Sequence, residues 1–128
     1  MNFLLDTHVF LWLAAYPEKL SNRAEQIVLN ADNSLFLSIV SLWEMQIKIQ
    51  LGKLELDISL VDFWHGQQEK LQLIFLPAKE EHVWALANLA LIHKDPFDRL
   101  LIAQSLYENM PIITADGTIS KYNAEVIW

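Results

Sequence analysis

The sequence contains no cysteine and little glycine or proline. Its 128 residues include three glycines and four prolines. The absence of cysteine excludes a disulfide framework, a zinc site built on thiolates and a cysteine nucleophile. A composition of 53% hydrophobic and 20% charged residues excludes the disordered, collagen-like and low-complexity classes. We therefore expect residues 1–128 to fold as a single domain with its own core.

Long apolar runs and an excess of positive charge are also missing. No uncharged apolar run approaches the roughly 18 residues that cross a bilayer. The apolar stretch MNFLLDTHVFLWLAAY has no basic region and contains Asp6, so it does not resemble a signal peptide, and we expect a cytoplasmic protein. The formal net charge of −7 argues against broad attraction to nucleic acids, so any such binding must be local.

Short apolar runs alternate with longer stretches of helical periodicity. The short runs lie at 3–5, 35–40, 73–76, 111–114 and 125–128. They lack the alternation of a half-exposed strand, so each is predicted to be a strand buried on both faces. Helices are predicted at about 7–15, 21–31, 41–51, 59–71, 79–92 and 97–108, with Ser21 and Ser59 as N-caps and Gly52 after a C-cap.

This order of elements predicts an α/β fold. Parallel strands joined by right-handed helical crossovers give a three-layer α/β/α sandwich with a mainly parallel sheet of about five strands. In such folds the loops at the carboxyl edge of the sheet form the site. Residues that follow strands or begin helices are therefore the first candidates for function.

Four acidic residues occupy such positions. Asp6 and Asp116 follow predicted strands, Asp98 begins the helix after His93, and Glu44 lies about one turn into a helix. Each acid taken alone is more simply explained as a cap or a turn. These alternatives are Asp6 as the cap of the first helix, Ser41 and Glu44 as a capping box, Asp95 as the N-cap before Pro96 with Asp98 favoured by the helix end, and Asp116 and Gly117 as a turn.

Independent caps do not explain why four acids should meet at one edge. Carboxylates crowded together raise one another's pKa unless a cation neutralises them. Oxygen ligands suit Mg²⁺ or Mn²⁺, which keep several waters and leave positions for a phosphate oxygen and an attacking water. The four acids together therefore predict metal-assisted hydrolysis of a phosphodiester bond.

With these residues in place, the chain resembles the PIN-domain ribonucleases, specifically the VapC-like toxins of type II toxin-antitoxin pairs. The matching stretches are LLDTHVFLW (4–12), SIVSLWEMQIKIQLGKL (38–54), HKDPFDRLLIAQS (93–105), IITAD (112–116) and YNAEVIW (122–128). The resemblance implies a PIN fold and Mg²⁺- or Mn²⁺-dependent endoribonuclease activity. It assigns the family's catalytic and metal-binding acids to Asp6, Glu44, Asp98 and Asp116, and its small hydroxyl residue to Thr114.

The resemblance also implies partners. Family members are usually dimers, are inhibited by a cognate antitoxin whose tail covers the groove, and assemble with that antitoxin on operator DNA. Five tryptophans in a small acidic chain independently favour an oligomer or a tight partner. Because the net charge disfavours general RNA affinity, we expect a narrow RNA substrate such as a structured tRNA or rRNA loop.

Several residues near the acids are weaker candidates. Those for substrate contact are Thr7, His8, Thr114 and Arg99. A salt bridge is the commoner role for Arg99. The histidines lack HExxH spacing and are interpreted as surface or locally bonded residues, although His93, like His8, flanks the acids. Lys48 and Lys53 could form a small basic patch, but a solvated face is the expected explanation.

Two other functions remain open. A phosphoaspartyl phosphatase or receiver domain also places an aspartate after the first strand beside Mg²⁺, but DTHVFLW lacks a second acid near Asp6, and we find no strand-end lysine there. A catalytically idle binding module would use the acids as caps and act through its apolar surface. The sequence also lacks the GxxxxGKS, GxGxxG and GxSxG motifs of other enzyme classes.

Overall fold

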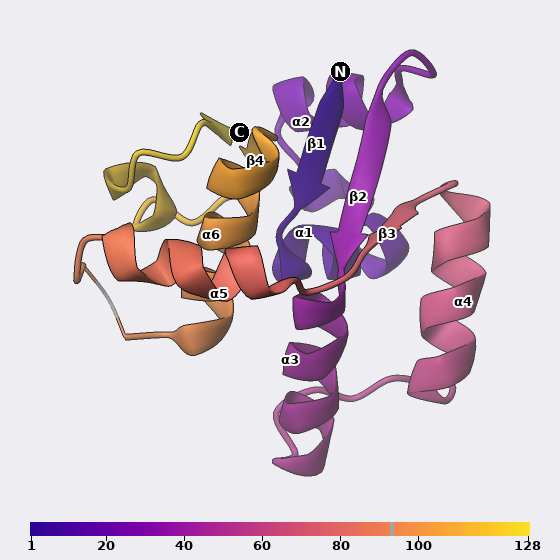
Figure 1. Cartoon of the computed structure of the whole chain (residues 1–128). Helices are drawn as coiled ribbons and strands as arrows, with labels where there is room; N and C mark the ends of the chain where they lie inside the picture. Colours follow the sequence, from indigo (N-terminus) through magenta and orange to yellow (C-terminus); the bar gives the residue numbers. More distant parts are fainter. Residues whose placement is uncertain (93) are drawn as a thin grey trace.

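The first strand, β1 (Asn2–Leu5), lies at the centre of the sheet. The computed structural model describes residues 1–92 and 94–128, so His93, which flanks the candidate acids in the sequence, lies outside the described residues. Within them, five strands form one sheet in the order β3-β2-β1-β4-β5, and every neighbouring pair is parallel (Figure 1). The remaining strands are β2 (Ser34–Ser38), β3 (Ile74–Leu76), β4 (Ile112–Ile113) and β5 (Val126–Ile127).

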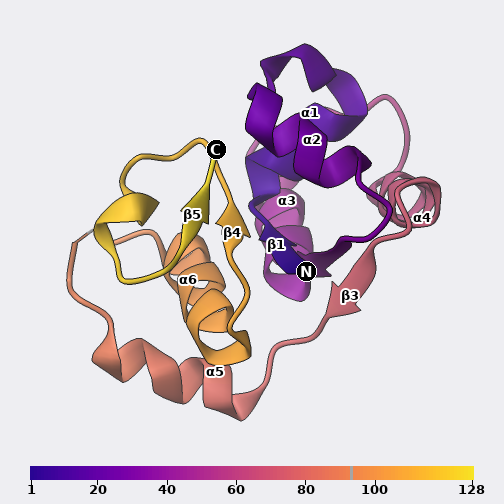
Figure 2. The same ribbon diagram turned by 90° about the horizontal axis from the view of Figure 1, so that it is seen from above.

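Helices cover both faces of this sheet. They are α1 (Thr7–Ala15), α2 (Asn22–Leu29), α3 (Ile39–Gln50), α4 (Leu60–Lys70), α5 (Glu80–Ala85) and α6 (Pro96–Glu108). Leu5 of β1 belongs to one apolar cluster with Phe10 of α1, and Leu4 belongs to another with Ile102 of α6. Figure 2 accordingly shows α1 and α2 on one side of the sheet and α5 and α6 on the other. The predicted three-layer α/β/α sandwich is confirmed.

The described helices are short. The longest in residues 1–92 and 94–128, α6, has 13 residues. None of the helices in these ranges combines the length and the apolar character needed to cross a membrane.

Local caps begin and end several helices as predicted. Ser21 and Ser59 accept hydrogen bonds from the amides of Ala24 and Asp62, at the starts of α2 and α4. Gly52 follows α3 with a φ of 72°, the left-handed conformation that glycine adopts without strain. These caps limit the helices locally, before tertiary packing acts.

The start of α3 differs from the prediction. β2 ends at Ser38, not at residue 40, because the Ser38 hydroxyl accepts a hydrogen bond from the Val40 amide at 3.0 Å and caps the helix. Ser41 and Glu44 both lie inside α3, so the capping box expected of them is wrong. Glu44 is free of a capping role.

The helix predicted at 79–92 is too long. α5 ends at Ala85 and is followed by a short 3-10 helix, η2 (Leu86–Asn88). The Ala90 carbonyl accepts a hydrogen bond from the Arg99 guanidinium at 2.8 Å, a side-chain donor from α6. Leu91 is 92% exposed, so the apolar pattern here does not mark a buried helical face.

Candidate active site

One pocket at the carboxyl edge of the sheet is lined by all four acids that the sequence identifies as candidate site residues. Its volume is about 280 Å³. Asp6 directly follows β1, and Asp116 comes three residues after β4. Glu44 lies in the second turn of α3, and Asp98 lies in the first turn of α6. The other lining residues are Thr7, His8, Leu11, Met45, Lys48, Lys53, Leu54 and Asp95.

Asp6 is buried and held by three donors. Its Oδ1 accepts from the Thr7 amide at 2.6 Å, and its Oδ2 accepts from Thr114 Oγ1 at 2.6 Å. His8 Nδ1 lies 3.2 Å from the same Oδ2. Burial raises the pKa of Asp6, although the nearby His8 and the hydrogen bonds from Thr114 and Thr7 oppose the rise. Asp6 thus caps α1 and also faces the pocket, so its two interpretations are compatible.

Glu44 is almost completely buried and joins two helices. Its Oε1 accepts a hydrogen bond from Thr7 Oγ1 at 2.8 Å. Its Oε2 forms an ion pair with Lys48, one helical turn later in α3. Thr7 Oγ1 also lies 2.9 Å from Ser41 Oγ, so the first residue of α1 is tied to the inner face of α3. These contacts fix the Glu44 carboxylate at the pocket wall.

Asp95 and Asp98 occupy different positions on α6. Asp95 is exposed and caps the helix, its Oδ1 accepting from the amides of Phe97 and Asp98 at 2.9 and 3.2 Å. Asp98 is half-buried, and burial raises its pKa to about 7. The negative charges of the other lining acids add to this rise, in decreasing order Asp6, Asp95, Glu44 and Asp116. The raised pKa of Asp98 therefore reflects burial first and repulsion from the neighbouring carboxylates second.

Asp116 closes a turn after β4. Its Oδ1 accepts from the Thr118 amide at 2.8 Å, and its own amide donates to Thr114 Oγ1 at 3.0 Å. Thr114 also donates to Asp6, so one buried hydroxyl connects the first and the last of the four candidate acids. The turn predicted for Asp116 is present, and the residue still lines the pocket.

The residues considered for substrate contact take different positions. Thr7 and His8 line the pocket. His8 Nε2 accepts from the Ala115 amide at 3.2 Å, and its Nδ1 faces Asp6 Oδ2. Thr114 lies behind Asp6 and is buried. Arg99 is not among the described residues that line the pocket, and its guanidinium donates to the Ala90 carbonyl and to Tyr122 Oη at 2.8 and 3.2 Å.

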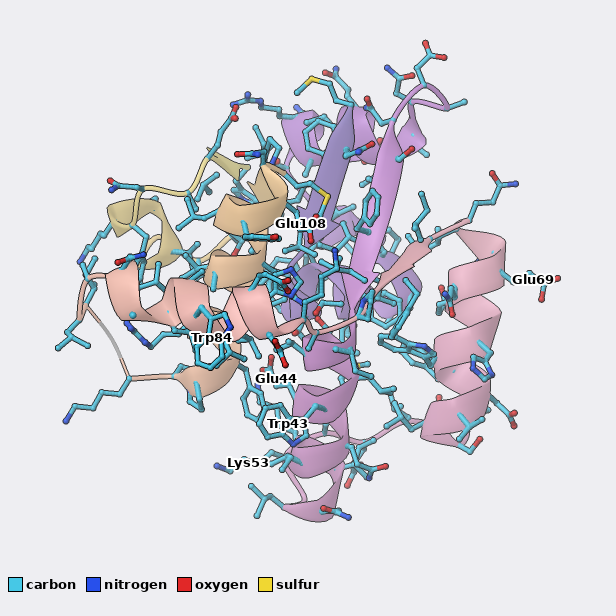
Figure 3. The ribbon with its side chains drawn as sticks, in the orientation of Figure 1. Trp43, Glu44, Lys53, Glu69, Trp84 and Glu108 are labelled. Carbon is cyan, nitrogen blue, oxygen red and sulfur yellow. The ribbon has the colours of Figure 1, made fainter. Side chains whose placement is uncertain are left out.

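Two lysines also line the pocket. Lys48 pairs with Glu44, and Lys53 follows the end of α3 (Figure 3). Burial lowers the pKa of Lys48, but the hydrogen bond and charge of Glu44, with Asp95 and Asp98, outweigh burial and raise it. Lys53 is exposed and the Lys48 side chain is 45% exposed, so the solvated face expected for these lysines is compatible with their place in the pocket lining. The ion pair between Lys48 and Glu44 could be predicted from the sequence, because Lys48 lies four residues after Glu44 and thus on the same helix face.

The donor atoms of the pocket fit a hard divalent cation. All four acids offer carboxylate oxygens, and two of them carry a raised pKa that a cation would lower. Across residues 1–92 and 94–128, no three His, Asp or Glu side chains already stand close enough together to hold an ion.

Comparison with known proteins gives one family match. A family model described as PIN domain matches residues 3–125. The ribonuclease VapC22 of Mycobacterium tuberculosis (strain ATCC 25618 / H37Rv) is 26% identical over 119 residues, which cover 93% of this chain and 90% of that protein.

Solved structures are similar in fold over almost the whole chain. VapBC2 from Rickettsia felis, bound to a DNA fragment from its promoter, gives a TM-score of 0.73 at 15% identity, covering 100% of this chain and 99% of that one. FitAcB from Neisseria gonorrhoeae gives a TM-score of 0.66 at 19% identity, covering 100% and 97%. VapBC-5 from Mycobacterium tuberculosis gives 0.60 at 17% identity, covering 98% and 95%.

Proposed function

The chain belongs to the PIN-domain family, and we propose that it is a metal-dependent endoribonuclease that acts as the toxin of a type II toxin-antitoxin pair. One observation carries the proposal: Asp6, Glu44, Asp98 and Asp116, from four separate parts of the chain, line a single pocket. The likeness to a curated ribonuclease, VapC22, supports RNA as the substrate.

We propose Mg²⁺ or Mn²⁺ as the cofactor, held by the four acids. When bound, such an ion supplies an activated water, a fixed position for the scissile phosphate and positive charge at the leaving oxygen. Asp6 enters this site already oriented by Thr7 and Thr114, and Glu44 is oriented by Thr7. These hydrogen bonds hold two of the four carboxylates in place, which lowers the cost of assembling the site.

Among the other residues that line the pocket, His8 would contact the substrate. His8 is half-buried beside Asp6, and its ring packs edge-on against Trp12 at 4.9 Å between centroids. It can therefore meet an RNA base or sugar at the pocket rim. The proposed roles of Thr7 and Thr114 are to position acids.

An apolar groove next to the pocket is the proposed site for the antitoxin. Its volume is about 700 Å³, and it shares Leu11 and Leu54 with the acid pocket. Trp12 and Phe63 also line it. Several similar folds come from VapBC complexes. An antitoxin tail lying in this groove would reach the acids and block RNA.

We propose that the toxin is a cytoplasmic homodimer and that operator DNA is bound through the antitoxin. The exposed apolar side chains support an additional protein interface, since Trp43 is 51% exposed and Trp84 is 67% exposed (Figure 3). The VapBC2 complex was solved with promoter DNA. The test is whether a small protein encoded beside this one co-purifies with it, suppresses RNA cleavage and supplies the DNA binding.

The two rival functions gain less support. A receiver or phosphoaspartyl phosphatase would need a second acid near Asp6, and Thr7 and His8 occupy the following positions. An idle binding module would not require buried acids to share one pocket, because an isolated cap is satisfied where it stands.

The decisive experiment is a cleavage assay with purified protein and a structured RNA. We expect cleavage with added Mg²⁺ or Mn²⁺, none in EDTA, and none by the variant Asp6→Asn. The matched control is Glu69→Gln, because Glu69 is exposed on α4 and points away from the body of the protein (Figure 3). Cleavage that persists in EDTA or in Asp6→Asn would exclude the metal mechanism.

A further inference from the structure

Two of the nine lysines and arginines in the chain line the acid pocket. Lys48 is half-buried, and its Nζ contacts Glu44 Oε2. Lys53 is exposed at the pocket rim. Lys48 lies in the last turn of α3 and Lys53 lies three residues past its end, so both line the pocket from the side of α3, and we call these two lysines the α3 wall.

The turn after α3 holds these two lysines together. The Lys53 amide donates to the Lys48 carbonyl at 2.8 Å, and the Gly52 amide donates to the Ile49 carbonyl at 3.1 Å. These two bonds, with the φ of 72° at Gly52, make a Schellman turn. The turn reverses the chain so that Lys53 returns to the side of the helix that carries Lys48.

Three other cationic side chains make contacts with groups outside the acid pocket or at its apolar neighbours. Lys79 pairs with Glu108 at 2.9 Å. Lys19 lies over the rings of Trp12 and Tyr16, and Arg99 donates to Ala90 and Tyr122. A net charge of −7 also repels RNA at long range. An RNA strand that enters the pocket therefore depends on local positive charge, and the α3 wall supplies it.

We propose that Lys48 and Lys53 bind the RNA phosphates next to the scissile one, on the α3 side of the pocket. Lys48 exchanges its ion pair with Glu44 for a phosphate oxygen when RNA enters. Lys53 binds the neighbouring phosphate from the rim. This inference rests on the proposed ribonuclease function and adds the binding residues for the strand.

The test measures binding instead of cleavage. A short labelled single-stranded RNA is titrated with protein carrying Asp98→Asn, in Mg²⁺, at several salt concentrations, and the dissociation constant is read by fluorescence anisotropy. We expect Lys48→Gln and Lys53→Gln each to weaken binding by on the order of tenfold at low salt. Each should also reduce the slope of log affinity against log salt by about 0.7, the value for one single-strand phosphate contact.

Two controls separate a phosphate contact from a general change in charge. Lys70→Gln removes the same charge from the exposed end of α4 and should leave the slope unchanged. Lys48→Arg keeps the charge and should retain most of the affinity. Thermal melting of every variant shows that each is folded.

The outcomes distinguish this inference from the function on which it rests. If the unsubstituted protein does not cleave RNA, the ribonuclease proposal itself fails. If it cleaves RNA but Lys48→Gln and Lys53→Gln keep the parental affinity and salt slope, the phosphate contacts are refuted. An equal loss in Lys70→Gln would also refute them, since the effect would then be long-range.

Discussion

The Thr7 hydroxyl donates to Glu44 Oε1 at 2.8 Å, and the Thr7 amide donates to Asp6 Oδ1 at 2.6 Å. One residue at the start of α1 therefore orients an acid that follows β1 and an acid on α3. The two acids lie 38 positions apart in the sequence. Their relative placement depends on a side chain that neither helix prediction nor strand prediction selects.

The first prediction concerns that hydroxyl. Thr7→Val keeps the shape of the side chain but removes the donor to Glu44, so the carboxylate loses one of its two recorded partners. We expect RNA cleavage to fall by about tenfold or more, because small errors in position cost much in rate. The free energy of unfolding should fall by about 1 kcal/mol. Thr7→Ser, which keeps the hydroxyl, should retain most activity; a similar loss in both variants would refute the orienting role.

The second prediction concerns the pH dependence of stability without divalent ions. Asp98 has a pKa of about 7 in the folded protein against 3.8 for the unperturbed group, so between these values the folded state holds a proton that the unfolded state has lost. Stability from this group is therefore highest at low pH and is lost as the pH rises toward 7. The raised pKa of Asp6 acts in the same direction. In EDTA, we expect the melting temperature to be higher near pH 5.5 than near pH 8.

The variant Asp98→Asn isolates this effect. Asparagine does not titrate, so the variant should melt at a higher temperature than the unsubstituted protein at pH 8 and should show a weaker pH dependence. Glu108 does not interfere with this measurement. Its pKa is lowered, so its contribution to the stability of the fold is lost only as the pH falls through the acidic range. A steeper pH dependence in Asp98→Asn would contradict the assignment.

Much of this site could be predicted because of one rule of topology. The carboxyl ends of parallel strands meet at one edge of the sheet, so the sequence alone predicts that Asp6 and Asp116 are neighbours. The DPFD motif at the start of a predicted helix indicated Asp98 as the third candidate. The pocket confirms that these acids are neighbours, and their role as metal ligands stays a prediction.

The rest could not be predicted because it depends on tertiary contacts. Ser38, not Ser41, caps α3, and its hydroxyl also contacts buried Gln104 of α6. Local sequence cannot show which of two nearby serines meets such a partner. The helix predicted at 79–92 ends at Ala85. Further along this stretch, the Ala90 carbonyl accepts a hydrogen bond from the Arg99 guanidinium, which belongs to α6.

The third prediction concerns metal binding in the absence of RNA. A cation that binds only the folded state raises stability by mass action, and it also relieves the repulsion among the carboxylates. We expect Mg²⁺ or Mn²⁺ to raise the melting temperature at pH 8, with a smaller rise near pH 5.5, where Asp98 is largely protonated. Differential scanning fluorimetry measures both.

The matched variants decide whether the pocket is responsible. Asp6→Asn should remove most of the rise in melting temperature, and Glu69→Gln should keep it, since Glu69 lies outside the pocket. A rise of equal size in both variants would place the cation elsewhere on this acidic protein.

The last prediction separates the two aspartates of DPFD. Asp95→Asn should retain most cleavage and stability, because asparagine can also accept hydrogen bonds from the amides of Phe97 and Asp98. Asp95→Ala should lower the free energy of unfolding by about 1 kcal/mol through loss of the cap. Asp98→Asn should leave the fold intact and abolish metal-dependent cleavage, because an uncharged amide replaces a ligand. Urea unfolding and the cleavage assay measure these effects. An equal loss of activity in Asp95→Asn and Asp98→Asn would mean that Asp95 also serves the reaction, since it too lines the pocket.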